Sequence, residues 1–200
     1  MNKPFIAIEG PIGVGKSSLA NRLSHSLGFY EEKEIVDENP FLSDFYDDIE
    51  KWSFQTEMFF LCNRYKQIRD IEELRQGVVS DYHKNKIFAK NTLNASEFDK
   101  FSRIFDILTE DLEMPNIIIF LDADLEVLKS RIAKRNRSFE SHIEDDYLLT
   151  LKKDYQAYYE SLKNEGANIV LIDTTNVDFV ENEDDYQDIL NIVKPMIGAR

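Results

Sequence analysis

The segment from Gly10 to Ser17 reads G-P-I-G-V-G-K-S, a complete match to the phosphate-binding pattern G-x-x-x-x-G-K-[ST]. It follows the apolar stretch 5–8 and opens the amphipathic stretch 19–27, so we expect a strand, a loop and a helix in that order. Glycines let such a loop curl until its N–H groups point at phosphate oxygens, and the helix adds its positive amino-terminal end. This context predicts that the chain binds a nucleoside triphosphate.

The loop also assigns roles to individual side chains. Lys16 is expected to reach the β- and γ-phosphates, and the Ser17 hydroxyl to coordinate Mg²⁺. A glycine-rich turn beside an exposed lysine is the alternative, and the flanking strand and helix argue against it. The residues expected to hold the phosphates are Gly10, Pro11, Ile12, Gly13, Val14, Gly15, Lys16, Ser17 and Ser18.

Length, charge and cysteine content narrow the class of protein. Two hundred residues suit one domain spanning 1–200, and a net charge of −14 argues against nucleic acid as a partner. Cys62 is the only cysteine, which excludes an internal disulfide, and the apolar run 58–62 predicts that it is buried in the core. No apolar run reaches the ~18 residues of a membrane span, and the first strand leaves no room for a signal peptide. We therefore expect a cytoplasmic protein without membrane contact.

Strand-like and helix-like segments alternate along the chain, which predicts an α/β fold. We expect a five-stranded parallel sheet covered by helices on both faces, with ligands at the carboxyl ends of the strands. The long helical segments 51–74 and 143–165 leave faces that a homodimer would cover. Strands are expected at 4–9, 32–36, 78–80, 117–122 and 169–172, and helices at 16–27, 41–46, 51–74, 96–110, 125–134, 143–165 and 184–196.

A GTP-binding switch protein would need an N-K-x-D motif to bind guanine. The two N-K dipeptides, at 2–3 and 85–86, are not followed by that aspartate. A small-molecule kinase fits better. Such an enzyme needs a general base, residues that hold the acceptor, and arginines that neutralise charge during transfer. The basic run R-I-A-K-R-N-R supplies three arginines, and Arg131 and Arg135 share one helical face. We expect Arg131 and Arg135 to act in catalysis and Arg137 to bind the nucleotide.

Several motifs occur in an order that resembles the deoxyribonucleoside kinase family over essentially the whole chain. They are I-E-G-P-I-G-V-G-K-S, E-I-V, F-Y-D-D-I-E-K-W-S-F, F-F-L-C-N-R-Y-K, D-Y-H and R-I-A-K-R-N-R-S-F-E. Within the family, the likeness is strongest to the deoxyguanosine kinases of bacteria. The resemblance implies a P-loop kinase fold with an arginine-rich lid. It also implies ATP and Mg²⁺ as cofactors, and phosphorylation of the 5′-hydroxyl of a deoxyribonucleoside.

The resemblance also implies site residues. Glu34, expected at the end of the second strand, matches the base beside the 5′-hydroxyl, and Asp81 is a second candidate that also lies near Mg²⁺ in relatives. Tyr46 and Glu140 match the pair that binds the sugar 3′-hydroxyl, and Arg64 matches an arginine near the 5′ end and the base.

Two positions depart from the family pattern. The sequence Asp81-Tyr82-His83 replaces an acidic-Arg-Ser triplet. Asn85 takes roughly the place at which relatives often carry an aspartate that faces the base, so the resemblance implies that Asn85 binds the substrate. Asp122 also ends an apolar strand, but the resemblance favours Asp81 as the magnesium ligand.

The side chain of Glu57 indicates which base of the acceptor nucleoside the protein binds. It lies seven residues, two helical turns, before Arg64, where many relatives that accept adenine or cytosine have glutamine. A carboxylate offers only acceptors, and guanine offers two adjacent donors, N1–H and N2–H₂. Deoxyguanosine is therefore the expected substrate. The alternatives are a deoxyadenosine/deoxycytidine kinase, a nucleoside monophosphate kinase or a non-catalytic P-loop subunit.

Overall fold

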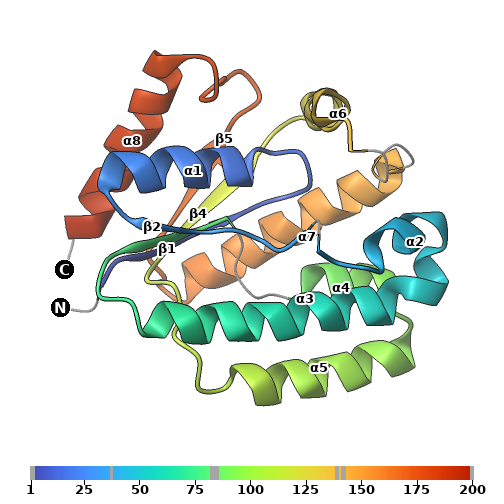
Figure 1. Cartoon of the computed structure of the whole chain (residues 1–200). Coiled ribbons are helices and arrows are strands. Elements are labelled where there is room, and N and C mark those ends of the chain that lie inside the picture. The colour runs from blue at the N-terminus through green and yellow to red at the C-terminus, as the bar shows by residue number, and fades with distance from the viewer. Residues whose placement is uncertain (1–2, 37, 82–85, 138–139, 141–142, 199–200) are drawn as a thin grey trace.

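The computed structural model describes residues 3–36, 38–81, 86–137, 140 and 143–198 (Figure 1). Its sheet has five parallel strands in the order β2-β3-β1-β4-β5, which confirms the predicted α/β class. The strands are β1 (Phe5–Glu9), β2 (Tyr30–Glu32), β3 (Val78–Ser80), β4 (Ile117–Asp122) and β5 (Ile169–Asp173). The helices are α1 (Lys16–Leu27), α2 (Leu42–Asp47), α3 (Ile49–Glu72), α4 (Ile87–Thr92), α5 (Ala95–Thr109), α6 (Leu125–Arg135), α7 (Asp145–Asn164) and α8 (Glu183–Gly198).

Helices cover both faces of the sheet. Helices α1 and α8 lie on one face, α3, α4 and α7 lie on the other, and α5 packs outside α3 (Figure 1). The central strands β1 and β4 are buried along almost their whole length, as parallel strands covered on both sides must be. Side chains from β1, β4, α1 and α8 form the largest apolar cluster, which fixes the loop after β1 against a rigid base. No helix among the described residues is long and apolar enough to cross a membrane.

Strand β2 lies at the edge of the sheet, where it pairs only with β3. The prediction for this strand, 32–36, was wrong by several residues, because its extent is set by pairing with the three residues of β3 and not by the apolar Ile35 and Val36. Glu34 consequently lies two residues beyond the strand. The side chain of Gln67 on α3 holds this segment by donating a hydrogen bond to the Lys33 carbonyl oxygen at 2.6 Å.

Two further expectations are corrected. The short helix α4 was missed. Cys62 is exposed on α3, not buried in the core. Consecutive helical residues point in directions about 100° apart, so an apolar run of five cannot face the core at every position.

Candidate active site

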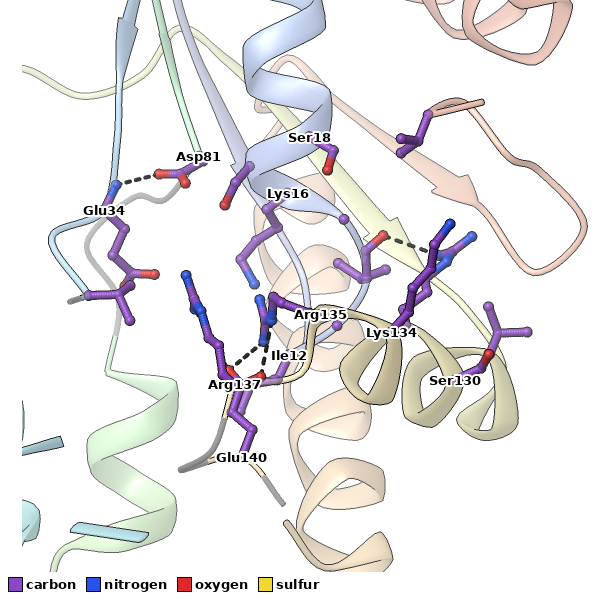
Figure 2. Close-up of a pocket in the computed structure, with 18 of the residues that line it drawn as sticks. Ile12, Lys16, Ser18, Glu34, Asp81, Ser130, Lys134, Arg135, Arg137 and Glu140 are labelled. Carbon is purple, nitrogen blue, oxygen red and sulfur yellow. Dashed lines mark hydrogen bonds and ion pairs between the residues drawn. The ribbon is translucent and has the colours of Figure 1, made fainter. Parts of the chain in front are cut away.

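A cavity of about 1190 Å³ opens where the segments after β1, β2, β3 and β5 come together. Helices α2, α3, α6 and α7 complete its walls, so that residues far apart in sequence face a common space (Figure 2). This is the edge of the sheet at which parallel α/β folds bind ligands.

The phosphate-binding loop forms one wall of this cavity through Ile12 to Ser18. Gly13 has φ +82° and Gly15 has φ +104°, in the left-handed region that glycine adopts at no steric cost. A Cβ at Gly13 would lie 2.7 Å from Cγ1 of Ile132 on α6, and one at Gly15 would lie 2.8 Å from Cζ of Phe179. The loop therefore fits between α6 and the segment after β5 only because both residues are glycine.

Lys16 lies at the centre of the site. Its Nζ donates hydrogen bonds to the carbonyl oxygens of Gly10, at 2.9 Å, and Pro11, at 3.1 Å, both of which are buried. Burial lowers the pKa of Lys16, and the charge of Glu34 is the strongest of the effects that oppose this. Figure 2 shows the side chains of Lys16, Glu34, Arg135 and Arg137 converging on one space.

Glu34 and Asp81 are joined directly. The backbone N–H of Glu34 donates to the Asp81 carboxylate at 2.7 Å, and both side chains line the cavity (Figure 2). Burial raises the pKa of Glu34, and the negative charge of Asp81 raises it further, against the opposing charges of Arg64, Lys16 and Arg137. A carboxylate with a raised pKa is a stronger proton acceptor, so the geometry and the electrostatics both suit Glu34 to general base catalysis.

Arg64 and Asp122 do not line the cavity. Arg64 is buried behind Glu34, and its Nη1 donates to Ser80 Oγ at 3.1 Å. Asp122 makes an ion pair with Lys152 at 3.0 Å, which accounts for its charge without a metal ion. The predicted substrate residue Asn85 lies outside the described residues.

Tyr46, Glu57 and Glu140 line the part of the cavity beyond Lys16 and Glu34. Burial and then the charge of Glu140 raise the pKa of Tyr46, so its hydroxyl remains a hydrogen-bond donor. The Glu140 carboxylate accepts two hydrogen bonds from Arg135, one of them from Nε at 3.0 Å, and lies 3.7 Å from Arg137 Nη1. Two lid arginines and the expected sugar-binding carboxylate therefore form one cluster.

Some lining residues were missed by the sequence analysis. Lys134 lies inside the basic run of the lid, so the run itself was a signal for it. Tyr147 on α7 belongs to no recognisable motif, and only the packing of α7 against the sheet brings it to the cavity. The segment 175–179 after β5 also lines the cavity beside the phosphate-binding loop.

Arg131 takes a different position from the one predicted for a charge-neutralising arginine. Its Nη1 donates to the Val14 carbonyl at 3.2 Å and to Thr174 Oγ1 at 2.9 Å. Its Nη2 donates to the carbonyl oxygens of Thr174 and Val177 at 2.9 and 3.1 Å. The four terminal N–H groups of the guanidinium are thus engaged, and they join α6, the phosphate-binding loop and the segment after β5. The Arg131 guanidinium therefore holds these three segments together where they line the cavity.

The chain matches the deoxynucleoside kinase family model over residues 6–198. This chain belongs to the deoxynucleoside kinase family. It is 46% identical to a deoxyguanosine kinase of Bacillus subtilis, over 97% of this chain and 98% of that protein. It is 29% identical to a deoxyadenosine/deoxycytidine kinase of the same organism, over 96% and 93% of the two chains. Among solved structures it resembles the Mycoplasma mycoides deoxyadenosine kinase with bound dATP, with a TM-score of 0.82, 27% identity and coverage of 95% and 98% of the two chains.

For this deoxynucleoside kinase, we expect the Arg131→Lys substitution to raise KM for ATP by about tenfold and to change kcat less. A lysine cannot replace four hydrogen bonds, each of which contributes on the order of 1 kcal/mol, so the segment after β5 would lose its fixed position. Initial rates at varied ATP concentration measure the effect. Lys129→Ala is the control, because Lys129 pairs with Asp145 outside the cavity wall and its loss should leave KM unchanged. An unchanged KM in Arg131→Lys would contradict the positioning role.

Proposed function

We propose that this chain transfers the γ-phosphoryl group of ATP to the 5′-hydroxyl of a purine deoxyribonucleoside, with deoxyguanosine preferred. The observation that carries this proposal is that the phosphate-binding loop, Glu34 and Glu57 line one continuous cavity. A phosphate-binding loop, a candidate proton acceptor and a candidate base-binding carboxyl that share one cavity support this reaction. The 46% identity to a protein named deoxyguanosine kinase supports the same substrate.

In the proposed mechanism, Glu34 accepts the proton of the 5′-hydroxyl as the hydroxyl oxygen attacks the γ-phosphorus. Lys16, Arg135 and Arg137 stabilise the negative charge on the transferred group, because all three side chains reach the space beside Glu34 (Figure 2). Tyr46 and Glu140 hold the sugar by its 3′-hydroxyl. Arg131 keeps the segment after β5 in place beside the phosphate-binding loop.

Ser17 and Asp81 fit a magnesium ion by their chemistry. Both line the cavity and offer a hydroxyl and a carboxylate oxygen, the ligand types that Mg²⁺ prefers. The described residues hold no group of three or more metal-binding side chains, which agrees with an ion that takes its remaining ligands from phosphates and water. Such an ion, when bound, neutralises charge on the phosphates of ATP.

Two rival functions differ from the proposal in measurable ways. A nucleoside monophosphate kinase would bring the acceptor's own phosphate against Glu34, whose negative charge would repel it. A non-catalytic P-loop subunit would need neither Lys16 nor a proton acceptor. A screen of the four deoxynucleosides and their monophosphates with labelled ATP distinguishes these functions, with Lys16→Ala as the inactive control. We expect deoxyguanosine to be phosphorylated fastest above pH 8, where Glu57 is ionised; a preference for deoxyadenosine at that pH would overturn the guanine assignment, and transfer only to monophosphates would overturn the nucleoside acceptor.

We expect Glu34→Gln to lower kcat by about 10²–10⁴-fold and to leave the KM for the nucleoside little changed, because the amide keeps the shape and cannot accept the proton. Steady-state kinetics at saturating ATP measure this. Asp81→Asn is the comparison, since Asp81 is the second candidate base. The pattern appearing in Asp81→Asn and not in Glu34→Gln would assign the proton transfer to Asp81.

We expect Glu57→Gln to lower kcat/KM for deoxyguanosine at least tenfold and to raise it for deoxyadenosine. A lost hydrogen bond to a charged group is worth roughly 1.5–3 kcal/mol, and the amide presents a donor to the guanine donors. The measurement is made above pH 8, where Glu57 is ionised because its pKa is raised to about 8. Gln55→Glu is the control on the exposed side of α3. Unchanged deoxyguanosine kinetics in Glu57→Gln would contradict base reading by Glu57.

We also propose that the enzyme is a cytoplasmic homodimer. Ile107 on the outer helix α5 is 67% exposed and Met114 beyond it is 53% exposed, and a second copy would cover such apolar side chains. Sedimentation equilibrium is expected to give twice the chain mass. A single-chain mass at micromolar concentration would contradict the dimer.

A further inference from the structure

Glu57 is a carboxyl group on α3 that lines the cavity. Among the described residues, no side chain makes a hydrogen bond or an ion pair with its carboxyl oxygens. It shares the wall with Phe60, one turn farther along α3, and with Phe88 of α4 and Tyr147 of α7. The base-binding end of the cavity is thus aromatic, with one unpaired acid in it.

Among the described residues, the ionisable groups that face Glu57 supply no compensating charge. Glu34, in the segment after β2, is negative when ionised, and the two nearby phenols, Tyr46 of α2 and Tyr147 of α7, are neutral because burial raises the pKa of each. On α3 itself, Arg64 lies two turns away beside Ser80. In the lid, Arg135 and Arg137 are directed to Glu140. Directly before α4, Lys86 pairs with Asp106 of α5.

An acid in these surroundings binds a proton readily, because an uncompensated charge is poorly solvated there. Burial, and to a lesser extent the charge of Glu34, raise the pKa of Glu57 to about 8. At neutral pH the free enzyme therefore holds Glu57 mainly as the neutral carboxylic acid. Its donor and acceptor pattern is then one O–H and one carbonyl oxygen.

The two protonation states of Glu57 are complementary to different purines. The carboxylate presents two acceptors, which match the adjacent N1–H and N2–H₂ donors of guanine. The carboxylic acid presents one donor and one acceptor, the same pattern as a glutamine amide, and this matches the N1 acceptor and N6–H₂ donor of adenine. The two forms differ by one proton and have the same shape, so the change requires no repacking of the aromatic wall.

We propose that the proton on Glu57 selects the purine: the ionised enzyme takes deoxyguanosine and the protonated enzyme takes deoxyadenosine. This inference rests on the proposed function, because it assumes that Glu57 reads the base of the acceptor. It adds that the enzyme's substrate preference follows pH, and that deoxyguanosine binding at neutral pH expels a proton from the site.

The test is the ratio of kcat/KM for deoxyadenosine to kcat/KM for deoxyguanosine, measured from pH 6 to pH 8.5 at constant ionic strength. Titration of Glu34, Lys16 or ATP affects both substrates equally and cancels in the ratio. If one substrate needs the acid and the other the carboxylate, the ratio rises by up to about tenfold for each unit that the pH falls. In Glu57→Gln the ratio is expected to be independent of pH, and Gln55→Glu, which places a new carboxyl on the exposed side of α3, should keep the wild-type slope.

Calorimetry gives a second readout that does not depend on turnover. Deoxyguanosine binding to the wild-type enzyme at pH 7 should release about one proton, seen as a dependence of the binding enthalpy on the ionisation enthalpy of the buffer, and Glu57→Gln should release none. A ratio independent of pH in the wild type, with deoxyguanosine still preferred, would overturn the proton switch and leave the proposed function in place. An equal slope in Glu57→Gln would overturn it by assigning the titration to another group. Failure of the wild type to use deoxyguanosine at any pH would overturn the proposed function itself.

Discussion

The close approach of the phosphate-binding loop to helix α6 and to Phe179 is the constraint on which the site depends. Because Gly13 and Gly15 have no side chains, the loop fits between these two neighbours, and Arg131 then joins all three parts with four hydrogen bonds. The phosphate-binding loop, α6 and the segment after β5 are therefore held in fixed positions relative to one another. Preorganisation of this kind lowers the reorganisation needed during phosphoryl transfer, which is where such enzymes gain most of their rate.

The remainder of the cavity is governed by an excess of buried acid. Glu34, Asp81, Glu57 and Glu140 all line it, and the cations that balance them are shared unevenly. Glu140 pairs with Arg135 and Arg137, and Glu34 has the nearby charges of Lys16, Arg64 and Arg137, whereas no cation among the described residues offsets the charge of Glu57. Glu34 and Glu57 therefore differ in the charges that surround them, which suits them to the different roles proposed for them.

The sequence predicted those elements whose positions depend on residues that are neighbours in the chain. The range of α1 and the position of the phosphate-binding loop followed from glycines and an amphipathic period, and both were confirmed at their predicted bounds. Strand β2 lies at other residues than predicted, because its register depends on pairing with β3. The direction of the Arg131 guanidinium was not predicted either, because it depends on carbonyl groups that lie more than forty residues away in the chain. Tyr147 could not be found because no pattern in the sequence of α7 distinguishes a cavity residue from a core residue. The family resemblance predicted the candidate residues, and the structure added which of them share charge.

The two sides of the cavity are built on parts of the sheet that differ in burial and in the number of neighbouring strands. The donor side rests on β1 and β4, the buried centre of the fold, whereas Glu34 follows an edge strand of three residues that is held by β3 and by the Gln67 side chain. Edge strands with few hydrogen bonds open locally at a lower free energy than central ones. The wall that carries Glu34 is thus the part of the cavity that opens locally at the lower free energy, while the side formed by the phosphate-binding loop stays folded.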